Sequence, residues 1–169
     1  MLFLNPDVIV PPALLARVRS VMYEERTRQL GVLGVRLMGW DFANARATGS
    51  VDSTGVFPVW SGWRDRRTGS PPASDAIEEV PALCGAFFLA REEALQAVAL
   101  GSGEVWDPRY FAYKEDVELS LRLHRAGWRI GMWHGAEAWH GRGWDPDRRK
   151  MPRSVRLLSA RNDVRLHAA

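Results

Sequence analysis

Cysteine is almost absent from the sequence, because Cys84 is the only one in 169 residues. No internal disulfide can form, which fits a reducing compartment and predicts a cytoplasmic protein. Cys84 lies in the apolar stretch "ALCGAFFLA". This setting favours a buried, unreactive thiol over a nucleophile, because reactive thiols need a positively charged and partly exposed environment.

Long hydrophobic runs are absent as well. None approaches the roughly 20 residues of a membrane-spanning helix. The first residues, "MLFLNPDVIV", show neither the basic region nor the cleavage site of a signal peptide. Repeats and low-complexity tracts are also lacking. With 46% hydrophobic and 25% charged residues, the composition predicts one globular domain with a substantial core.

Positive charge is scarce outside the C-terminal segment. The whole chain carries a net charge of +3, whereas residues 142–169 contain eight Lys or Arg against three Asp, a net +5. The rest of the chain is therefore slightly acidic. This distribution argues against nucleic-acid binding by the main body, and the basic segment lacks the interleaved aromatic residues of a nucleic-acid module. We expect no nucleic-acid partner.

Strand-like and helix-like segments alternate along the chain. The hydrophobic pattern predicts strands over residues 2–4, 30–39, 56–60, 80–90, 128–133 and 137–140. It predicts helices over residues 11–30, 91–100, 115–127 and 148–169. Residues 41–80 are the least regular part and are expected to be mostly loop. Alternating strands and helices predict an α/β layer fold.

Two acidic features stand at the ends of predicted elements. Asp7, in the Asn5-Pro6-Asp7 turn, follows a strand, where a carboxylate can hold Mg²⁺ or Mn²⁺ together with ligand phosphates. A turn residue is the simpler reading of Asp7. Glu115 and Asp116 open a helix, where acids are stabilised by the helix dipole. The chemical alternative is a general base that takes a proton from a hydroxyl.

Histidine supplies the third feature. His140, in "AWHGRGW", ends a predicted strand and can ligate a metal or contact a phosphate, although an exposed histidine is the simpler reading. Arg142 follows in a glycine-flanked loop and suits a diphosphate. The spacing between His134 and His140 matches no recognised zinc motif. His124 and His167 fall in helical segments and are expected to be structural.

Several stretches together resemble the later part of a family 2 glycosyltransferase of the rhamnosyltransferase-like branch. They are "FLNPDVIVPP", "DSTGVFP", "VPALCGAFFLAREEAL", "WDPRYFAYKEDVELSLRLHRAGWRI" and "AWHGRG", and they follow the family's order. "RSVRLLSARNDVRL" resembles the Arg-Asn segment that comes next in many such proteins. The resemblance implies a GT-A-like fold, with a mixed and mainly parallel sheet flanked by helices.

The resemblance also implies an activity. It is the transfer of a sugar, of the hexosyltransferase type, from a nucleotide-sugar donor to a glycan or lipid-linked acceptor by an inverting displacement. Cell-wall or surface polysaccharide synthesis is the implied setting. Asp116 falls on the expected base, and Glu115 would position the acceptor or the base. Asp7 and His140 would hold the divalent cation, Mg²⁺ or Mn²⁺. Asn5 replaces the first acid of the family's Asp-x-Asp motif.

Further positions follow from the same resemblance. Gly85 and Ala86 would leave room beside the donor sugar, and Arg142 would contact the diphosphate. Aromatic side chains would stack on the sugars of the acceptor, and they are Trp106, Tyr110, Phe111 and Tyr113.

The resemblance further implies that the family's N-terminal nucleotide-binding strands lie outside this sequence. Residues 1–143 would then form a partial catalytic domain, and the isolated chain is expected to lack efficient activity. The alternative is a non-catalytic remnant that binds a glycan or pairs with another chain. The strand at residues 2–4 would offer an open sheet edge, which predicts self-association.

Residues 144–169 are expected to form a basic helical tail. In a helix, Val155, Leu158 and Leu166 fall near one side and Arg149, Arg153, Arg156 and Arg161 are spread around the rest. Such a helix can bind peripherally to the inner face of an anionic membrane. Packing on the domain through the apolar side is an equal alternative.

Overall fold

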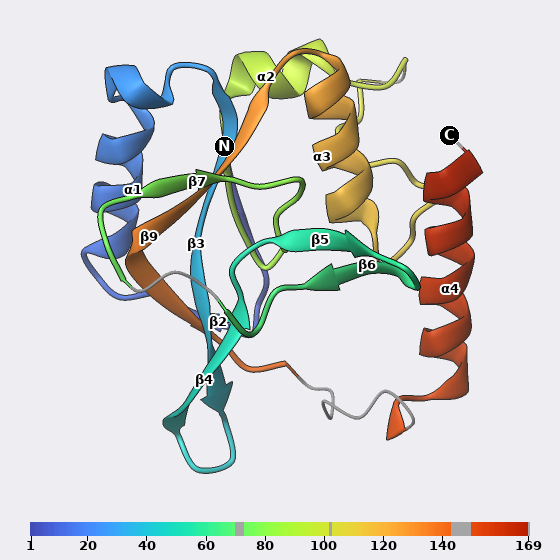
Figure 1. Cartoon of the computed structure of the whole chain (residues 1–169), viewed down its shortest axis with the longest axis horizontal. Helices are drawn as coiled ribbons and strands as arrows, with labels where there is room; N and C mark the ends of the chain where they lie inside the picture. Colours follow the sequence, from blue (N-terminus) through green and yellow to red (C-terminus); the bar gives the residue numbers. More distant parts are fainter. Residues whose placement is uncertain (70–72, 102, 143–149, 169) are drawn as a thin grey trace.

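A central sheet with helices on both faces forms the body of the molecule (Figure 1). The computed structural model describes residues 1–69, 73–101, 103–142 and 150–168. The helices are α1 (Leu14–Met22), the 3-10 turn η1 (Glu25–Thr27), α2 (Glu92–Ala97), α3 (Glu115–Arg125) and α4 (Arg153–Ala168). The strands are β1 (Leu2–Leu4), β2 (Val8–Ile9), β3 (Leu30–Asp41), β4 (Arg46–Ser53), β5 (Val56–Val59), β6 (Gly62–Asp65), β7 (Ile77–Glu79), β8 (Phe87–Ala90) and β9 (Arg129–His140).

The sheet is mixed, as expected. Its strand order is β1-β8-β3-β9-β2, with β4 paired to β3 and β7 paired to β9. Parallel pairing is concentrated in β3 and β9, because α3 carries the chain across the sheet before β9 begins. The other pairings among the described strands are antiparallel. A separate hairpin, β5–β6, lies across one face and reaches α4 (Figure 1).

Alternation along β3 explains why both faces of the sheet are covered. Leu33 and Leu37 lie in a core cluster with the apolar side of α1, whereas Val32 lies in a second cluster with α2 and α3. All three side chains are almost fully buried. A strand that is apolar on both faces needs a layer on each side, and this fixes the α/β arrangement.

Several element boundaries differ from the expectation. The first helix ends at Met22 instead of continuing towards Gly31, because the hydroxyl of Thr27 lies 2.8 Å from the carbonyl oxygen of Val21 and 3.0 Å from that of Met22. β9 is one strand where two were expected, and a shift in its register with β3 accommodates the polar His134-Gly135 interruption. β4 and β7 were not predicted, because both are polar and lie in the segment expected to be irregular.

The edge strand β1 pairs with β8, and the described strands offer it no second neighbour. Leu2 and Phe3 are half-buried and Leu4 is exposed, so the strand is less buried than its apolar sequence suggested. Self-association through this edge remains a prediction.

The C-terminal helix α4 packs on the body, which was one of the two alternatives for the basic tail. Leu166 is buried in a cluster with Val56, Trp63 and Val117, and Asn162 is fully buried. The apolar side that was considered for a membrane therefore faces protein instead. Arg149 lies outside the described residues. No helix within the described ranges is long and apolar enough to cross a membrane.

Candidate functional site

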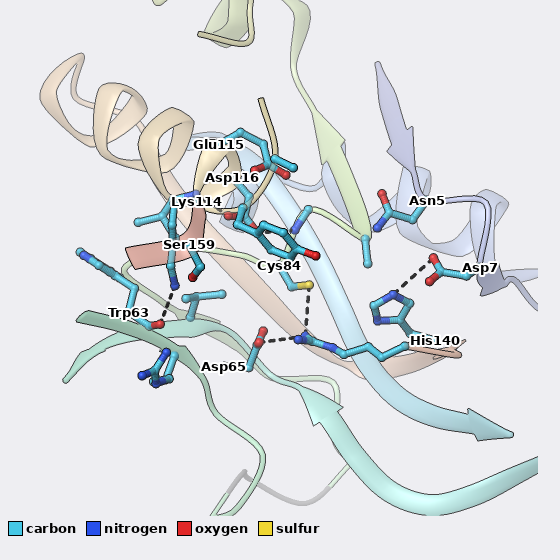
Figure 2. A pocket seen from close by; sticks show the side chains of 18 of the residues that line it. Asn5, Asp7, Trp63, Asp65, Cys84, Lys114, Glu115, Asp116, His140 and Ser159 are labelled. Carbon is cyan, nitrogen blue, oxygen red and sulfur yellow. Dashed lines mark hydrogen bonds and ion pairs between the residues drawn. The ribbon is translucent and has the colours of Figure 1, made fainter. Parts of the chain in front are cut away.

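One pocket of about 600 Å³ gathers most of the residues singled out from the sequence (Figure 2). Its walls come from the turn after β1, the β5–β6 hairpin, the loop before β8, the start of α3, the end of β9 and α4. The described lining residues are Asn5, Asp7, Val56, Trp63, Arg64, Asp65, Arg67, Cys84, Gly85, Ala86, Ala112, Tyr113, Lys114, Glu115, Asp116, Val117, His140, Arg142, Met151 and Ser159. Asp7, Asp116 and His140, which come from three separate segments, thus line the same pocket.

Strand pairing brings Asp7 and His140 together. β2 and β9 are antiparallel with Val8 opposite His140, so the residue before Val8 lies beside the end of β9. The N–H of Gly141 donates to the carbonyl oxygen of Asp7 at 3.0 Å, and His140 Nε2 lies 3.4 Å from Asp7 Oδ1. The N–H of Asn5 donates to the carbonyl oxygen of Ala86 at 3.0 Å, and both residues line the same pocket.

Asp52 holds the ring of His140 from behind. Its Oδ2 lies 2.8 Å from His140 Nδ1, and both side chains are buried. β4 pairs with β3 so that Ser53 faces Leu37 and Val51 faces Met38, which leaves Asp52 as the extra residue of a β-bulge. Bulges redirect a side chain in this way. Burial acts to raise the pKa of Asp52, but His140 and Arg142 outweigh it and lower that pKa below its usual value.

The carboxylate pair opens α3 in a tightly fixed geometry. Tyr113 and Lys114 both adopt left-handed backbone angles, with φ of 67° and 75°. Asp116 Oδ2 accepts a hydrogen bond from the Gly85 N–H at 2.9 Å, and Oδ1 accepts one from Val117 at 2.8 Å. These contacts aim Asp116 at the pocket. Consecutive left-handed non-glycine residues are costly and typically occur at functional sites.

Burial changes the acid strength of this pair. It raises the pKa of Glu115 to about 7, and the charge of Asp116 adds to the shift. Burial also raises the pKa of Asp116, against the Gly85 hydrogen bond, and nearby Asp65 adds to it. Glu115 Oε2 is buried without a hydrogen-bond partner among the described residues. The dipole of α3, expected to lower these pKa values, is outweighed by burial.

Arg142 is enclosed by two carboxylates. Its Nε lies 2.8 Å from Asp52 Oδ1 and its Nη2 lies 2.8 Å from Asp65 Oδ2. Together they raise the pKa of its guanidinium despite burial. Arg142 lines the pocket as expected, but its charge is already matched. Burial also raises the pKa of the Cys84 thiol well above its usual value, which agrees with an unreactive cysteine.

Three of the four aromatic residues lie outside the pocket lining, and Tyr113 alone belongs to it. Trp106 packs edge-on against Phe3 at 5.0 Å between ring centres. Tyr110 is buried in the cluster that includes Leu166. Phe111 is 87% exposed. Trp106 and Tyr110 thus use their rings in packing, whereas the ring of Phe111 is open to solvent. Stacking on acceptor sugars stays a prediction for these positions.

The other histidines lie away from the pocket, as expected. His134 Nε2 lies 3.0 Å from Glu78 Oε2, and His124 Nε2 lies 3.0 Å from the carbonyl oxygen of Pro81.

Three residues of the site, Asp52, Asp65 and Lys114, were given no role from the sequence. Asp52 was nevertheless within reach, because it begins the "DSTGVFP" stretch that carried part of the resemblance.

The residues present fit a divalent cation only in part. Asp7 and His140 offer one carboxylate and one ring nitrogen, and Asp52 orients that ring as outer partners of metal-bound histidines do. No group of three His, Cys, Asp or Glu within the described ranges is arranged to hold a metal. Two protein ligands suffice for a cation that takes its remaining oxygens from phosphates and water.

Comparison with known proteins identifies a family. A family model described as "Glycosyltransferase like family 2" matches residues 1–157, which include every pocket-lining residue named above except Ser159. No curated protein matches the chain.

Proposed function

The chain belongs to glycosyltransferase family 2, and on this premise we propose that it transfers a hexosyl group from a nucleotide-sugar donor to a hydroxyl group with inversion. The acceptor is a glycan or a lipid-linked sugar, in cell-wall or surface polysaccharide synthesis. The observation that carries the proposal is a pocket in which a half-buried carboxylate pair, Glu115 and Asp116, shares the lining with Asp7 and His140.

Asp116 is the proposed base. Its carboxylate takes the proton of the acceptor hydroxyl, whose oxygen forms a bond to the anomeric carbon of the donor. The bond between that carbon and the phosphate oxygen breaks, and the nucleoside diphosphate leaves. The raised pKa of Asp116 supports this role, because a stronger base accepts the proton more readily.

Glu115 is the proposed partner of the base. Its pKa of about 7 lets it carry a proton near neutral pH, and it lines the pocket next to the base. A protonated Glu115 would also relieve the repulsion that an ionised Asp116 would otherwise meet.

Asp7 and His140 are the residues that would hold Mg²⁺ or Mn²⁺. When bound, the cation neutralises charge on the diphosphate. Asn5 and Arg142 lie beside them in the lining and would contact the phosphates. Gly85 and Ala86 keep the adjoining wall small, which suits a sugar ring.

The cellular location is part of the proposal. We place the reaction on the cytoplasmic side of the inner membrane, with Arg153, Arg156 and Arg161 available to anionic lipid because they are exposed on α4.

Release of nucleoside diphosphate tests the proposed activity. The purified chain, alone and joined to the nucleotide-binding strands that the resemblance implies, is incubated with UDP-, GDP- and dTDP-hexoses, Mn²⁺ or Mg²⁺, and polyprenyl-linked or free glycan acceptors. From the extended form we expect acceptor-dependent release for one donor class, loss of release in Asp116→Asn, and normal release in Asp41→Asn, which changes an exposed turn. The chain alone should release little. NMR of the product shows whether the anomeric configuration is inverted. Binding of glycans without release from any donor would favour the non-catalytic alternative.

A further inference from the structure

We propose that α4 positions the carboxylate pair of the pocket, and that Asn162 and Asp163 form the clamp that does so. The effect of this clamp on catalysis rests on the proposed function, whereas the contacts that form the clamp are independent of it. Both residues act through other groups and are positioning residues.

Asn162 holds the loop before α3. It is fully buried, and its Nδ2 donates to the carbonyl oxygens of Ala112 at 2.9 Å and Tyr113 at 2.8 Å. One side-chain amide therefore uses both of its N–H groups on two consecutive carbonyls. Buried carbonyl groups need a hydrogen-bond partner because water cannot reach them. The loop therefore keeps the path in which Asn162 satisfies both carbonyls.

The fixed loop is the one that carries the strain of the site. Tyr113 and Lys114 have left-handed backbone angles immediately before Glu115 and Asp116. A conformation of this kind persists only when the surroundings hold it in place. The carbonyl oxygen of Tyr113 accepts a hydrogen bond from Asn162. The ammonium group of Lys114 forms an ion pair with Asp163, the next residue of α4. The clamp thus acts at the point where the direction of the carboxylate pair is set.

Asp163 holds the opposite wall. Its Oδ1 accepts a hydrogen bond from the Trp63 N–H at 3.4 Å and lies 3.5 Å from Lys114 Nζ, while Lys114 Nζ donates to the carbonyl oxygen of Trp63 at 2.6 Å. Figure 2 shows Lys114 and Trp63 together on one side of the pocket. Gly62 leaves the space for the carboxylate, since a Cβ there would lie 2.8 Å from it.

The two contacts join three segments that are far apart in the sequence. Asn162 and Asp163 tie α4 to the loop before α3 and to the β5–β6 hairpin, and both of these segments line the pocket. Ser159, one turn earlier on α4, lines the pocket itself. The basic C-terminal helix is therefore inferred to keep the pocket walls at a fixed separation.

Asn162→Leu in the full chain tests the clamp, because leucine fills a similar volume without amide donors. We expect amide hydrogen exchange at residues 112–118 to rise about tenfold or more, because two buried hydrogen bonds are lost and the loss of one alone has an effect of about tenfold. Exchange in β3 and β9 should stay unchanged. Turnover should fall while KM for the donor changes less than kcat. Val164→Ala, a change at an exposed position on the same helix, is the control.

Gly62→Ala approaches the clamp from the hairpin and keeps the proposal testable if Asn162→Leu fails to fold. Its new methyl group displaces Asp163, and the φ of 110° at this position adds strain to the hairpin itself. The same rise in exchange is expected at residues 112–118, outside the hairpin. Unchanged exchange at residues 112–118 in either folded variant overturns the clamp. Raised exchange with no nucleoside diphosphate release by the wild-type chain in its extended form supports the clamp and overturns the transferase, so the two proposals can fail separately.

Discussion

Asp52 Oδ2 lies 2.8 Å from Nδ1 of His140, and this contact turns the opposite ring nitrogen towards Asp7, 3.4 Å away. The arrangement is built from three segments that lie far apart in the sequence. A bulge in β4 aims Asp52, the end of β9 supplies His140, and β2 pairs so that Asp7 faces it. A neutral imidazole held in this way presents Nε2 as a ligand.

Replacing Asp52 tests this arrangement. Asp52→Asn keeps the size of the side chain but removes the negative charge behind His140, so the ring becomes a poorer ligand. We expect affinity for Mn²⁺ in the presence of nucleoside diphosphate to fall about 10- to 100-fold. Isothermal titration calorimetry or EPR of Mn²⁺ measures it. Asp41→Asn in the neighbouring β3–β4 turn should leave the affinity unchanged. Equal affinities in the two variants would remove Asp52 from the site.

Replacing Asp116 tests the base. Asp116→Asn retains one acceptor oxygen for Gly85 but cannot take a proton, so turnover should fall by about 10²- to 10⁴-fold. Donor affinity should change little, because the phosphates are expected at Asp7 and His140. Turnover by nucleoside diphosphate release and affinity by calorimetry separate the two effects. An Asp116→Asn enzyme with wild-type turnover would show that the base is assigned wrongly.

The pKa of Glu115 makes the stability of the protein depend on pH. Folding raises that pKa from 4.5 to about 7, so ionised Glu115 is less stable in the folded than in the unfolded chain. Its destabilising effect is absent below about pH 4.5 and grows as pH rises to 7. Glu115→Gln should therefore raise the free energy of unfolding at pH 8 by on the order of 1–3 kcal/mol.

Urea unfolding at pH 5 and pH 8 measures this dependence. The gain from Glu115→Gln should shrink at pH 5, where the wild-type carboxyl is mostly protonated. Glu25→Gln, at an exposed site on η1, is the matched control and should show no such trend. A gain of equal size at both pH values would mean that the substitution acts by some route other than charge.

Local signals in the sequence predicted much of the fold. The apolar run of residues 30–39 corresponds to β3. The helical pattern of residues 115–127, which opens with acidic residues, corresponds to α3. β4 was missed because its only buried residues are the polar Asp52 and Ser53 at its end. No pattern of apolar residues marks such a strand, and its place is set by pairing with β3.

The candidate site was predicted unevenly for a similar reason. Asp7, Asp116 and His140 stand at element ends and could be found by position and resemblance. Trp106 and Tyr110 carry the same chemical signal as sugar-stacking residues, and composition cannot tell a ring in the core from one in a pocket. Asn162 belongs to the Arg-Asn segment that carried part of the resemblance. Its contacts could not be predicted, because a single polar residue on a helix reveals its partners only when the helix has been packed.

The wall beside Asp116 leaves no space for a larger residue at Gly85. A Cβ there would lie 3.2 Å from the Cβ of Asp116, so the carboxylate must shift by a few tenths of an ångström. We expect Gly85→Ala to lower kcat about tenfold, because catalytic geometry is sensitive to small displacements. Gly101→Ala, where the added carbon meets no atom of the described residues within 4 Å, is the control and should keep full activity. Wild-type kcat for Gly85→Ala would show that the wall tolerates the shift.

Binding of α4 to membranes should be electrostatic, because its apolar side is already used. Leu166 is buried and Leu158 is half-buried against the body, whereas Arg153, Arg156 and Arg161 are exposed. Each arginine near an anionic surface contributes about 1 kcal/mol, and added salt screens this attraction. We therefore expect co-sedimentation with phosphatidylglycerol vesicles that fades with salt and is lost when these three arginines become glutamine. The variant Arg19→Gln, Arg28→Gln, Arg46→Gln removes the same charge from exposed positions elsewhere and should still bind. Equal recovery in the supernatant with and without vesicles would end the membrane proposal without affecting the pocket, since none of the three arginines on α4 lines it.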